Sequence, residues 1–310
     1  MNQTKVRKKQ ILIVGRVATF WENTAQTPLQ IVEDPFFIER DITLYLKRDD
    51  LIHPYVSGNK WRKLKYNLFE AEKQGFTTLL TFGGAYSNHI AAVAVAGRAT
   101  GFDTIGIIRG EELRADANPT LRFASQCGMK LLFVSREAYR NKEELAQKHG
   151  VGYYIIPEGG SNILAVKGVA EVVSEIQSQL HTPVDYLCTA LGTGGTAAGL
   201  LSASKVKVLV FPSLKIKADE ATQMILQHLS VSEVKAEIMT DYHFGGYGKV
   251  TKELWQFIKT FENQTHIPLE QVYTGKMMFG IYDLVKKGFF KRGQVIVALH
   301  TGGLQGRTVF

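Results

Sequence analysis

The chain of 310 residues has very little cysteine: only Cys127 and Cys188 occur, without a second cysteine at CxxC spacing. Two lone cysteines build neither a disulfide framework nor a metal site, so we expect a reducing compartment and no metal. Long apolar runs are also missing. The run 11–14 is too short for a membrane span or a signal-peptide core, and we expect a cytoplasmic protein with no membrane partner.

Clusters of one charge are rare as well. The formal net charge is +8, but the basic residues are spread out, apart from residues 5–9. No basic stripe alternates with aromatic residues, which argues against nucleic acid as a partner. Residues 1–21 contain no acid, and we interpret them as an irregular basic extension.

Glycine pairs, by contrast, are frequent, and four of the five close an apolar run. The pairs are 83–84, 159–160, 194–195, 245–246 and 302–303; the runs are 78–82, 153–156, 186–191 and 295–299. Continuous apolar runs are typical of strands that are buried on both faces, as in parallel sheets. Since ligands bind outside the carboxyl ends of such strands, we expect the pairs to surround one ligand site.

Helical patterns alternate with these strands. We predict helices at 88–98, 119–126, 161–180, 196–204, 249–261 and 276–287, and further strands at 43–48, 104–108, 130–134 and 206–211. The alternation predicts a doubly wound α/β protein, with two domains and the site between them.

Residues 57–64 (SGNKWRKL) place a lysine at the start of a helix whose apolar face is Leu64, Leu68 and Ala71. Unpaired backbone N–H groups and the helix dipole disfavour a second cation at that position. Lys60 is therefore either an ordinary solvated lysine or a Schiff-base lysine whose pKa is lowered by its surroundings.

Three other motifs contain candidate binding groups. Residues 191–199 (LGTGGTAAG) offer backbone N–H groups and hydroxyls for a phosphate, or form a purely structural turn; they match neither the Walker nor the Rossmann pattern. Residues 83–89 (GGAYSNH) could bind a carboxylate or only cap a helix, and without Gly-x-Ser-x-Gly a Ser-His hydrolase is disfavoured. Tyr247 and Tyr273 lie among glycines, where packing is the commoner role.

In this order, SGNKWRKL, GGAYSNH, PEGGSN, LGTGGTAAGL, GGYG, VYTGK and HTGG resemble the D-cysteine desulfhydrase and 1-aminocyclopropane-1-carboxylate deaminase family, from about residue 40 to 306. That family belongs to the fold-type-II pyridoxal-phosphate enzymes, built like the tryptophan synthase β subunit. The resemblance implies a homodimer with two open twisted, mostly parallel sheets flanked by helices. It places the cofactor between a large domain (1–60 and 165–310) and a small domain (61–164).

The resemblance also implies the site. Lys60 forms the Schiff base with pyridoxal 5'-phosphate, and Asn88 bonds the ring hydroxyl. The small amino-acid substrate is flanked by Tyr247 and Tyr273, with Ser87 near the reacting carbon. The implied catalytic residues are Lys60, Ser87, Tyr247 and Tyr273; the substrate carboxylate is bound by Ser87, Asn88 and His89; the phosphate is held by Lys63, Gly192, Thr193, Gly194, Gly195 and Thr196.

Thr274 and Thr301 separate the two branches of the family. The ring-opening deaminases have an acid at the first position, facing the pyridine nitrogen, and leucine at the second; threonines are the desulfhydrase pattern. A hydroxyl keeps the pyridine nitrogen protonated less well than a carboxylate does, which weakens the electron sink. Expelling a thiol, with a pKa of about 8.5, demands less of that sink than breaking a carbon–carbon bond. We therefore predict β-elimination of D-cysteine to pyruvate, sulfide and ammonia.

Some positions depart from the pattern: Tyr86 replaces a usual glutamine, residues 200–240 look short, and residues 1–40 match poorly. Substrate choice therefore stays open between D-cysteine desulfhydration, 1-aminocyclopropane-1-carboxylate deamination, and a related D-amino-acid ammonia-lyase, dehydratase or racemase. A protein that binds the cofactor without turnover is a further alternative, against which the intact set Lys60, Ser87, Tyr247 and Tyr273 argues.

Overall fold

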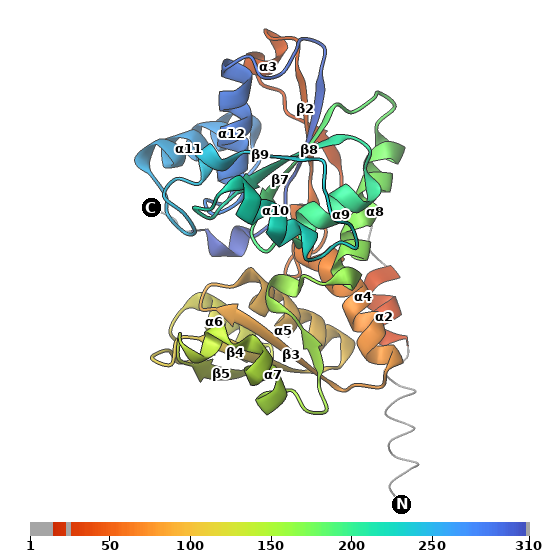
Figure 1. Ribbon diagram of the computed structural model, residues 1–310, viewed down its shortest axis with the longest axis vertical. Coiled ribbons are helices and arrows are strands. Elements are labelled where there is room, and N and C mark those ends of the chain that lie inside the picture. Colours follow the sequence, from red (N-terminus) through yellow and green to blue (C-terminus); the bar gives the residue numbers. More distant parts are fainter. Residues whose placement is uncertain (1–14, 23–25, 308–310) are drawn as a thin grey trace, which may run out of the picture. The chain divides into compact units, whose positions relative to one another are not determined.

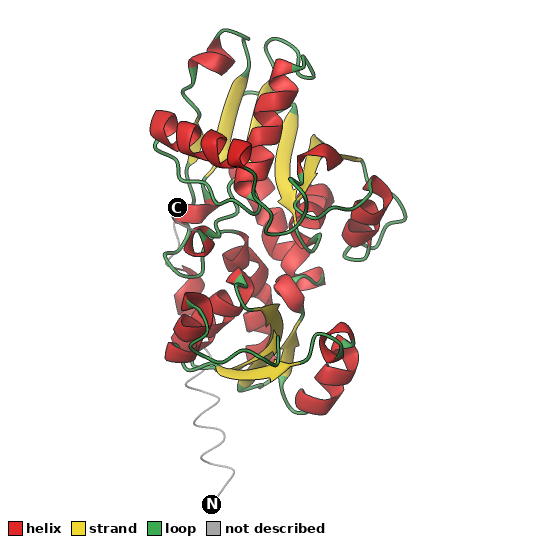
Figure 2. Ribbon diagram, turned by 90° about the vertical axis from the view of Figure 1, so that its left-hand side faces the viewer, coloured by secondary structure: helices red, strands yellow, loops and turns green. Residues whose placement is uncertain are grey.

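The computed structural model describes residues 15–22 and 26–307. The chain divides into two compact units. The first unit comprises Met1–Ala25, His53–Val56 and Lys60–Ala165, and the second comprises Gln26–Ile52, Ser57–Asn59 and Val166–Phe310, in both cases as far as they are described. Each unit has its own sheet with flanking helices (Figures 1 and 2), so the predicted α/β fold of two mostly parallel sheets is confirmed.

The second unit has a six-stranded sheet, in the order β1-β2-β10-β7-β8-β9, among its described residues. All neighbours are parallel except β1 and β2. The strands are β1 (Leu29–Ile31), β2 (Thr43–Lys47), β7 (Tyr186–Leu191), β8 (Lys207–Pro212), β9 (Ala236–Ile238) and β10 (Val295–Leu299). The helices are α3 (Pro35–Ile38), α8 (Ile163–Gln179, from residue 166 on), α9 (Gly195–Ala203), α10 (Ala218–Leu226), α11 (Lys252–Thr265) and α12 (Thr274–Lys286).

Both faces of this sheet are buried, which explains its continuous apolar runs. Along β7, Tyr186 and Cys188 belong to the core that is shared with α11 and α12, whereas Leu187 belongs to the core that is shared with α8, α9 and α10. Figure 1 shows these two helix groups on opposite sides of the strands. The carboxyl ends of β7 and β10 lie at the same edge, because these strands are parallel neighbours.

The first unit has a four-stranded parallel sheet in the order β5-β4-β3-β6. Its strands are β3 (Thr78–Gly84), β4 (Asp103–Arg109), β5 (Lys130–Val134) and β6 (Tyr154–Ile156). Its helices are α2 (Arg16–Glu22), α4 (Asn59–Lys73, from residue 60 on), α5 (Asn88–Thr100), α6 (Pro119–Gln126) and α7 (Lys142–His149). Among the described residues, none of the helices of either unit is long and apolar enough to span a membrane.

The N-terminal part differs from the expected division, which put residues 1–60 with 165–310. Helix α2 packs within the first unit instead, because the ring of Trp21 lies 4.8 Å from that of Trp61 and 6.5 Å from that of Phe69. Residues 1–14, within the expected basic extension, lie outside the described residues. Cys127 and Cys188 are both free thiols.

Candidate functional site

Lys60 and Lys63 lie near the start of α4, three residues apart and therefore on one side of the helix. Lys60 Nζ donates to the carbonyl oxygen of Gly159 at 3.2 Å. Lys63 Nζ donates to the same carbonyl at 3.4 Å and to Ser161 Oγ at 2.9 Å. Gly159 follows β6, so the end of this strand meets the start of α4 within the first unit.

Burial changes the chemistry of both lysines. Desolvation lowers the pKa of Lys60 to about 8, and burial together with the Lys60 charge lowers the pKa of Lys63 well below its ordinary value. With a pKa of 8, roughly a tenth of Lys60 is a neutral amine at pH 7, against roughly one part in 2,000 for an ordinary lysine. Because the neutral amine is the nucleophile, the surroundings of Lys60 favour covalent chemistry. Lys63 is 2% exposed and already bonded, which does not favour its expected contact with a phosphate.

We predict that the rate constant for cofactor capture by the apo-protein rises with pH and levels off above about pH 8. The reason is that the neutral fraction of Lys60 grows until its lowered pKa is passed. Stopped-flow absorbance across pH 6 to 10 measures the midpoint. A midpoint near the ordinary lysine value, about 10.4, would contradict the lowered pKa.

Ser87 and Asn88 lie where β3 turns into α5. Ser87 caps this helix: its Oγ accepts a hydrogen bond from the backbone N–H of Ile90 at 3.3 Å, which leaves its own proton available. The Oδ1 atom of Asn88 is buried, and none of the described residues donates a hydrogen bond to it. Such an atom is costly to leave unpaired, so it marks a place where a bound donor would be stabilised.

His89 does not fit its expected role as a carboxylate ligand. Its side chain is 2% exposed, and its Nε2 lies 2.7 Å from Thr81 Oγ1. The Thr81 hydroxyl donates to the carbonyl of Ile156 at 2.8 Å, so it must accept from His89 Nε2–H. Burial and the charges of Lys60 and Lys63 lower the pKa of His89 well below its ordinary value. The neutral ring therefore links β3, β6 and α5 and offers an anion no second donor.

The loop between β7 and α9 contains the predicted phosphate cradle. Backbone N–H groups in the first turn of α9 have no acceptor in the helix, and the positive dipole end lies there. Within the second unit, Asn59 Nδ2 donates to Thr196 Oγ1 at 2.8 Å, and the backbone N–H of Asn59 donates to the Thr301 carbonyl at 3.3 Å. The residue that precedes Lys60 in the chain is thus held by two of the predicted motifs.

Gly194 is required by the local packing, whatever binds beside it. It caps α9 with a φ of +86°, and a Cβ atom there would lie 2.0 Å from the carbonyl oxygen of Met224. Any larger residue would push α10 away, so a substitution at Gly194 cannot test phosphate binding by itself. His228 also contacts this loop, because its Nε2 donates to the Thr193 carbonyl at 2.8 Å.

The structure brings the two predicted tyrosines together. The ring centroids of Tyr247 and Tyr273 are 6.0 Å apart, with an angle of 66° between the planes. Tyr273 caps α12, and a Cβ atom on Gly192 would lie 3.1 Å from its ring. The Tyr273 ring therefore lies beside Gly192, and Tyr247, which packs against Tyr273, is 51% exposed.

Thr274 is fully buried, and its polar groups are engaged. Its Oγ1 donates to Glu270 Oε1 at 3.1 Å and accepts from the Glu270 backbone N–H at 3.1 Å. Glu270, which the sequence analysis missed, also accepts from the backbone N–H groups of Val272 and Tyr273, at 2.6 and 2.8 Å. The expected contact of Thr274 with a pyridine nitrogen is therefore not favoured, since its hydroxyl already helps to cap α12.

Thr301 offers a second hydroxyl that could contact the pyridine nitrogen in place of Thr274. It is partly exposed at the end of β10, and its hydroxyl forms no hydrogen bond among the described residues. The turn that carries it is held by His300, whose Nε2 donates to the Pro268 carbonyl at 2.7 Å and whose Nδ1 accepts from Gly302 N–H at 3.3 Å. Burial lowers the pKa of His300 and so favours this neutral form.

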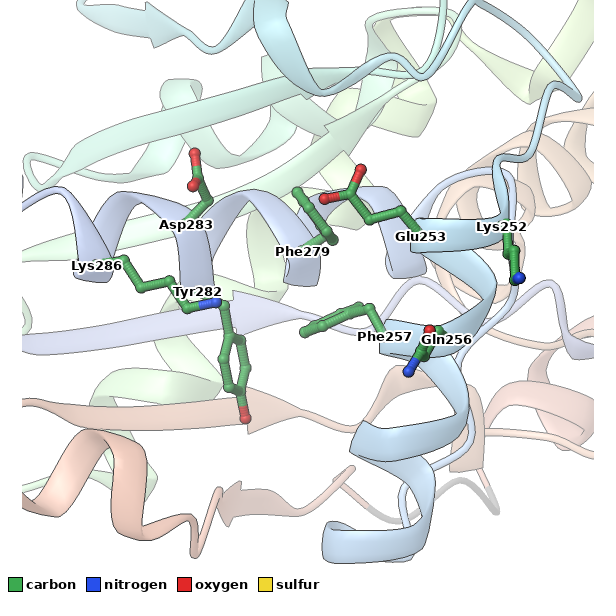
Figure 3. Close-up of a pocket in the computed structure, with 8 residues that line it drawn as sticks. All are labelled: Lys252, Glu253, Gln256, Phe257, Phe279, Tyr282, Asp283 and Lys286. Carbon is green, nitrogen blue, oxygen red and sulfur yellow. The ribbon is translucent and has the colours of Figure 1, made fainter.

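The second unit also has a cleft (Figure 3). It has a volume of about 610 Å³ and is bordered by α11 and α12. Its lining consists of Lys252, Glu253, Gln256, Phe257, Phe279, Tyr282, Asp283 and Lys286. None of the predicted site residues lines it.

Comparisons with known proteins agree with the motifs. A model of pyridoxal-phosphate-dependent enzymes matches residues 21–302. The chain is 33% identical over 293 residues to a mitochondrial bifunctional D-cysteine desulfhydrase/1-aminocyclopropane-1-carboxylate deaminase of Arabidopsis thaliana, covering 85% of this chain and 73% of the relative. It is 30% identical over 286 residues to a D-cysteine desulfhydrase of Klebsiella pneumoniae, covering 84% and 86%. A solved 1-aminocyclopropane-1-carboxylate deaminase homologue superposes with a TM-score of 0.78 at 29% identity, covering 94% and 96%.

Proposed function

This chain belongs to the pyridoxal-phosphate-dependent enzymes, and we propose that it is a lyase that converts D-cysteine and water to pyruvate, hydrogen sulfide and ammonia. The activities named for the Arabidopsis and Klebsiella relatives support this reaction. When bound, pyridoxal phosphate supplies an electron sink for negative charge at the substrate Cα. The contribution of the protein is to hold the cofactor and substrate and to move protons.

The described residues fit this cofactor. Lys60 supplies an amine with a lowered pKa for covalent attachment, and the unpaired Oδ1 of Asn88 suits the ring hydroxyl. The N–H groups of residues 192–196 suit the phosphate. Of the two threonines that were expected to contact the cofactor, Thr301 is the one we propose to face the pyridine nitrogen.

We assign the substrate to Ser87 and the two tyrosines. The Ser87 hydroxyl, with its proton available, would bond the substrate carboxylate beside Asn88 and lie near Cα. The exposed ring of Tyr247, packed edge-on against Tyr273, would flank the substrate side chain. Lys60 would take or return the Cα proton, which its pKa of about 8 allows near neutral pH.

The accessible hydroxyl of Thr301 is the observation that carries the choice of reaction. A neutral hydroxyl does not hold a proton on the pyridine nitrogen as a carboxylate does, so a good leaving group on Cβ is needed. Ring opening of 1-aminocyclopropane-1-carboxylate is the second candidate, supported by the names of the Arabidopsis protein and the solved homologue. For this second reaction the chain lacks a carboxylate that could face the pyridine nitrogen. The carboxylate of Glu270 is buried and already engaged at the start of α12.

We expect kcat/KM for D-cysteine to exceed that for 1-aminocyclopropane-1-carboxylate by at least about tenfold, or about 1.4 kcal/mol of transition-state stabilisation. The test incubates the purified holoenzyme with D-cysteine, L-cysteine, D-serine and 1-aminocyclopropane-1-carboxylate and measures keto acid and sulfide. If 2-oxobutanoate forms from 1-aminocyclopropane-1-carboxylate faster than sulfide forms from D-cysteine, ring opening replaces β-elimination as the proposed reaction.

The proposal also includes a homodimer, which rests on the family resemblance, and a cytoplasmic location, which is the default expectation from the sequence. Light scattering coupled to size-exclusion chromatography tests the assembly, for which we expect twice the chain mass of 34.6 kDa.

A further inference from the structure

Lys276 is a buried lysine that ends the VYTGK motif, and neither the sequence analysis nor the proposed function gives it a role. It is the third residue of α12, and it is 1% exposed. Its Nζ donates to three backbone carbonyls of the second unit: those of His243 and Gly246, both at 2.8 Å, and that of Ser213 at 3.4 Å. An ammonium group has three N–H donors, so these acceptors can satisfy all of them.

Two of these carbonyls belong to the loop that carries Tyr247. This loop is strained: Phe244 has a φ of +52°, in the left-handed region that residues other than glycine rarely adopt. Gly245 and Gly246 also have positive φ values, +91° and +115°. Such backbone persists only where surrounding contacts hold it.

The turn itself supplies few contacts. Gly246 N–H donates to the His243 carbonyl at 3.0 Å, and Lys249 N–H donates to the Gly246 carbonyl at 3.1 Å. Lys276 adds a charged donor to each of these carbonyls, and charge-assisted hydrogen bonds are about twice as strong as neutral ones. Within the turn, His243 Nδ1 also accepts from the Gly245 N–H at 2.9 Å, and the ring of Phe244 packs on Phe279 of α12, with centroids 4.9 Å apart.

We propose that Lys276 is a positioning residue, which clamps residues 243–248 to α12 and thereby holds Tyr247 against Tyr273. Tyr273 caps the same helix, so α12 sets the places of both rings. The proposal deepens the proposed function, because it rests on the assignment of Tyr247 to the substrate side chain. A buried lysine that only stabilised the fold would have no such link to turnover.

Burial lowers the pKa of Lys276 to about 8, while the charge of Glu270 opposes this shift. At pH 7 most of the lysine therefore keeps its positive charge and its third N–H donor. This agrees with a clamp that uses all three carbonyls.

The first test is amide hydrogen exchange on the holoenzyme. We expect Lys276→Met to speed exchange at Gly246 and Lys249 about tenfold or more, because the loop opens locally. Lys286→Met is the matched control: the same change at an exposed position of the same helix, labelled in Figure 3. Lys276→Gln, which keeps N–H donors without charge, should lie between wild type and Lys276→Met. It serves as the main variant if Lys276→Met does not fold.

The second test is a double-mutant cycle. If Lys276 acts through the ring of Tyr247, Lys276→Met should lower kcat/KM about tenfold in the wild type and change it less than twofold in Tyr247→Ala, which lacks the ring. Equal losses in both backgrounds, or unchanged exchange at Gly246 and Lys249, would overturn the proposal. If the wild type converts none of D-cysteine, L-cysteine, D-serine and 1-aminocyclopropane-1-carboxylate, the proposed function fails. The hydrogen-exchange comparison then tests by itself whether Lys276 holds residues 243–248.

Discussion

Replacing Lys60 by alanine is expected to remove the visible absorbance of the bound cofactor and to lower turnover at least about a thousandfold. The amine that attaches the cofactor and moves the Cα proton is lost, and Lys63 cannot replace it. Its Nζ is bonded to Ser161 Oγ at 2.9 Å and to the Gly159 carbonyl at 3.4 Å. The measurements are the absorbance spectrum of the purified protein and sulfide release from D-cysteine.

Lys73→Ala is the control for this experiment. It makes the same change at the end of the same helix, where the lysine side chain is 80% exposed. We expect its spectrum and turnover to match those of the wild type. A Lys60→Ala protein that kept the absorbance band would contradict the assignment of the attachment lysine.

Replacing Ser87 by alanine is expected to lower kcat/KM for D-cysteine about a hundredfold or more. The variant loses the hydroxyl that we assign to the substrate carboxylate and the region of Cα. It also loses the cap of α5, because Ser87 Oγ accepts from Ile90 N–H, at a cost of about 1 kcal/mol of stability. The kinetic effect must therefore be separated from the loss of the cap.

Asn118→Ala makes that separation. Asn118 caps α6 of the same unit by accepting from Leu121 N–H at 3.0 Å, and it belongs to none of the proposed binding motifs. Both variants should lose a similar amount of unfolding free energy in urea titrations, and only Ser87→Ala should lose turnover. Equal kinetic losses in both would show that Ser87 is only a cap.

The sequence was sufficient to predict helices and strands whose buried residues follow a local pattern. The run 186–191 predicts a strand that is buried on both faces, and β7 divides its side chains between two cores. The apolar face of Leu64, Leu68 and Ala71 predicts α4, and all three are fully buried. Asn118 followed by proline predicts the start of α6 at residue 119.

Elements with little buried surface were missed. Helix α7 buries only Leu145 among its residues, so it has no apolar periodicity. Helix α10 buries Ala221 and Ile225 alone. Strand β9 is a three-residue edge strand whose pattern is too short to recognise.

The site was predictable as a set of motifs, but not in its distances. Which hydroxyl is free to bond a ligand depends on the fold: Glu270 engages that of Thr274, whereas that of Thr301 forms no hydrogen bond among the described residues. The role of His89 depends on Thr81 of the neighbouring strand. The contacts of Lys276 with residues 30 or more positions away leave no mark in the local sequence.

Borohydride reduction of the holoenzyme, followed by proteolysis and mass mapping of the labelled peptide, tests the central claim most directly. The reduction fixes the cofactor to the nitrogen that holds it, whatever the substrate. We predict that the label lies on Lys60, the second residue of α4. A label on Lys63, which reaches the same Gly159 carbonyl, or on any other lysine would contradict this account of the site.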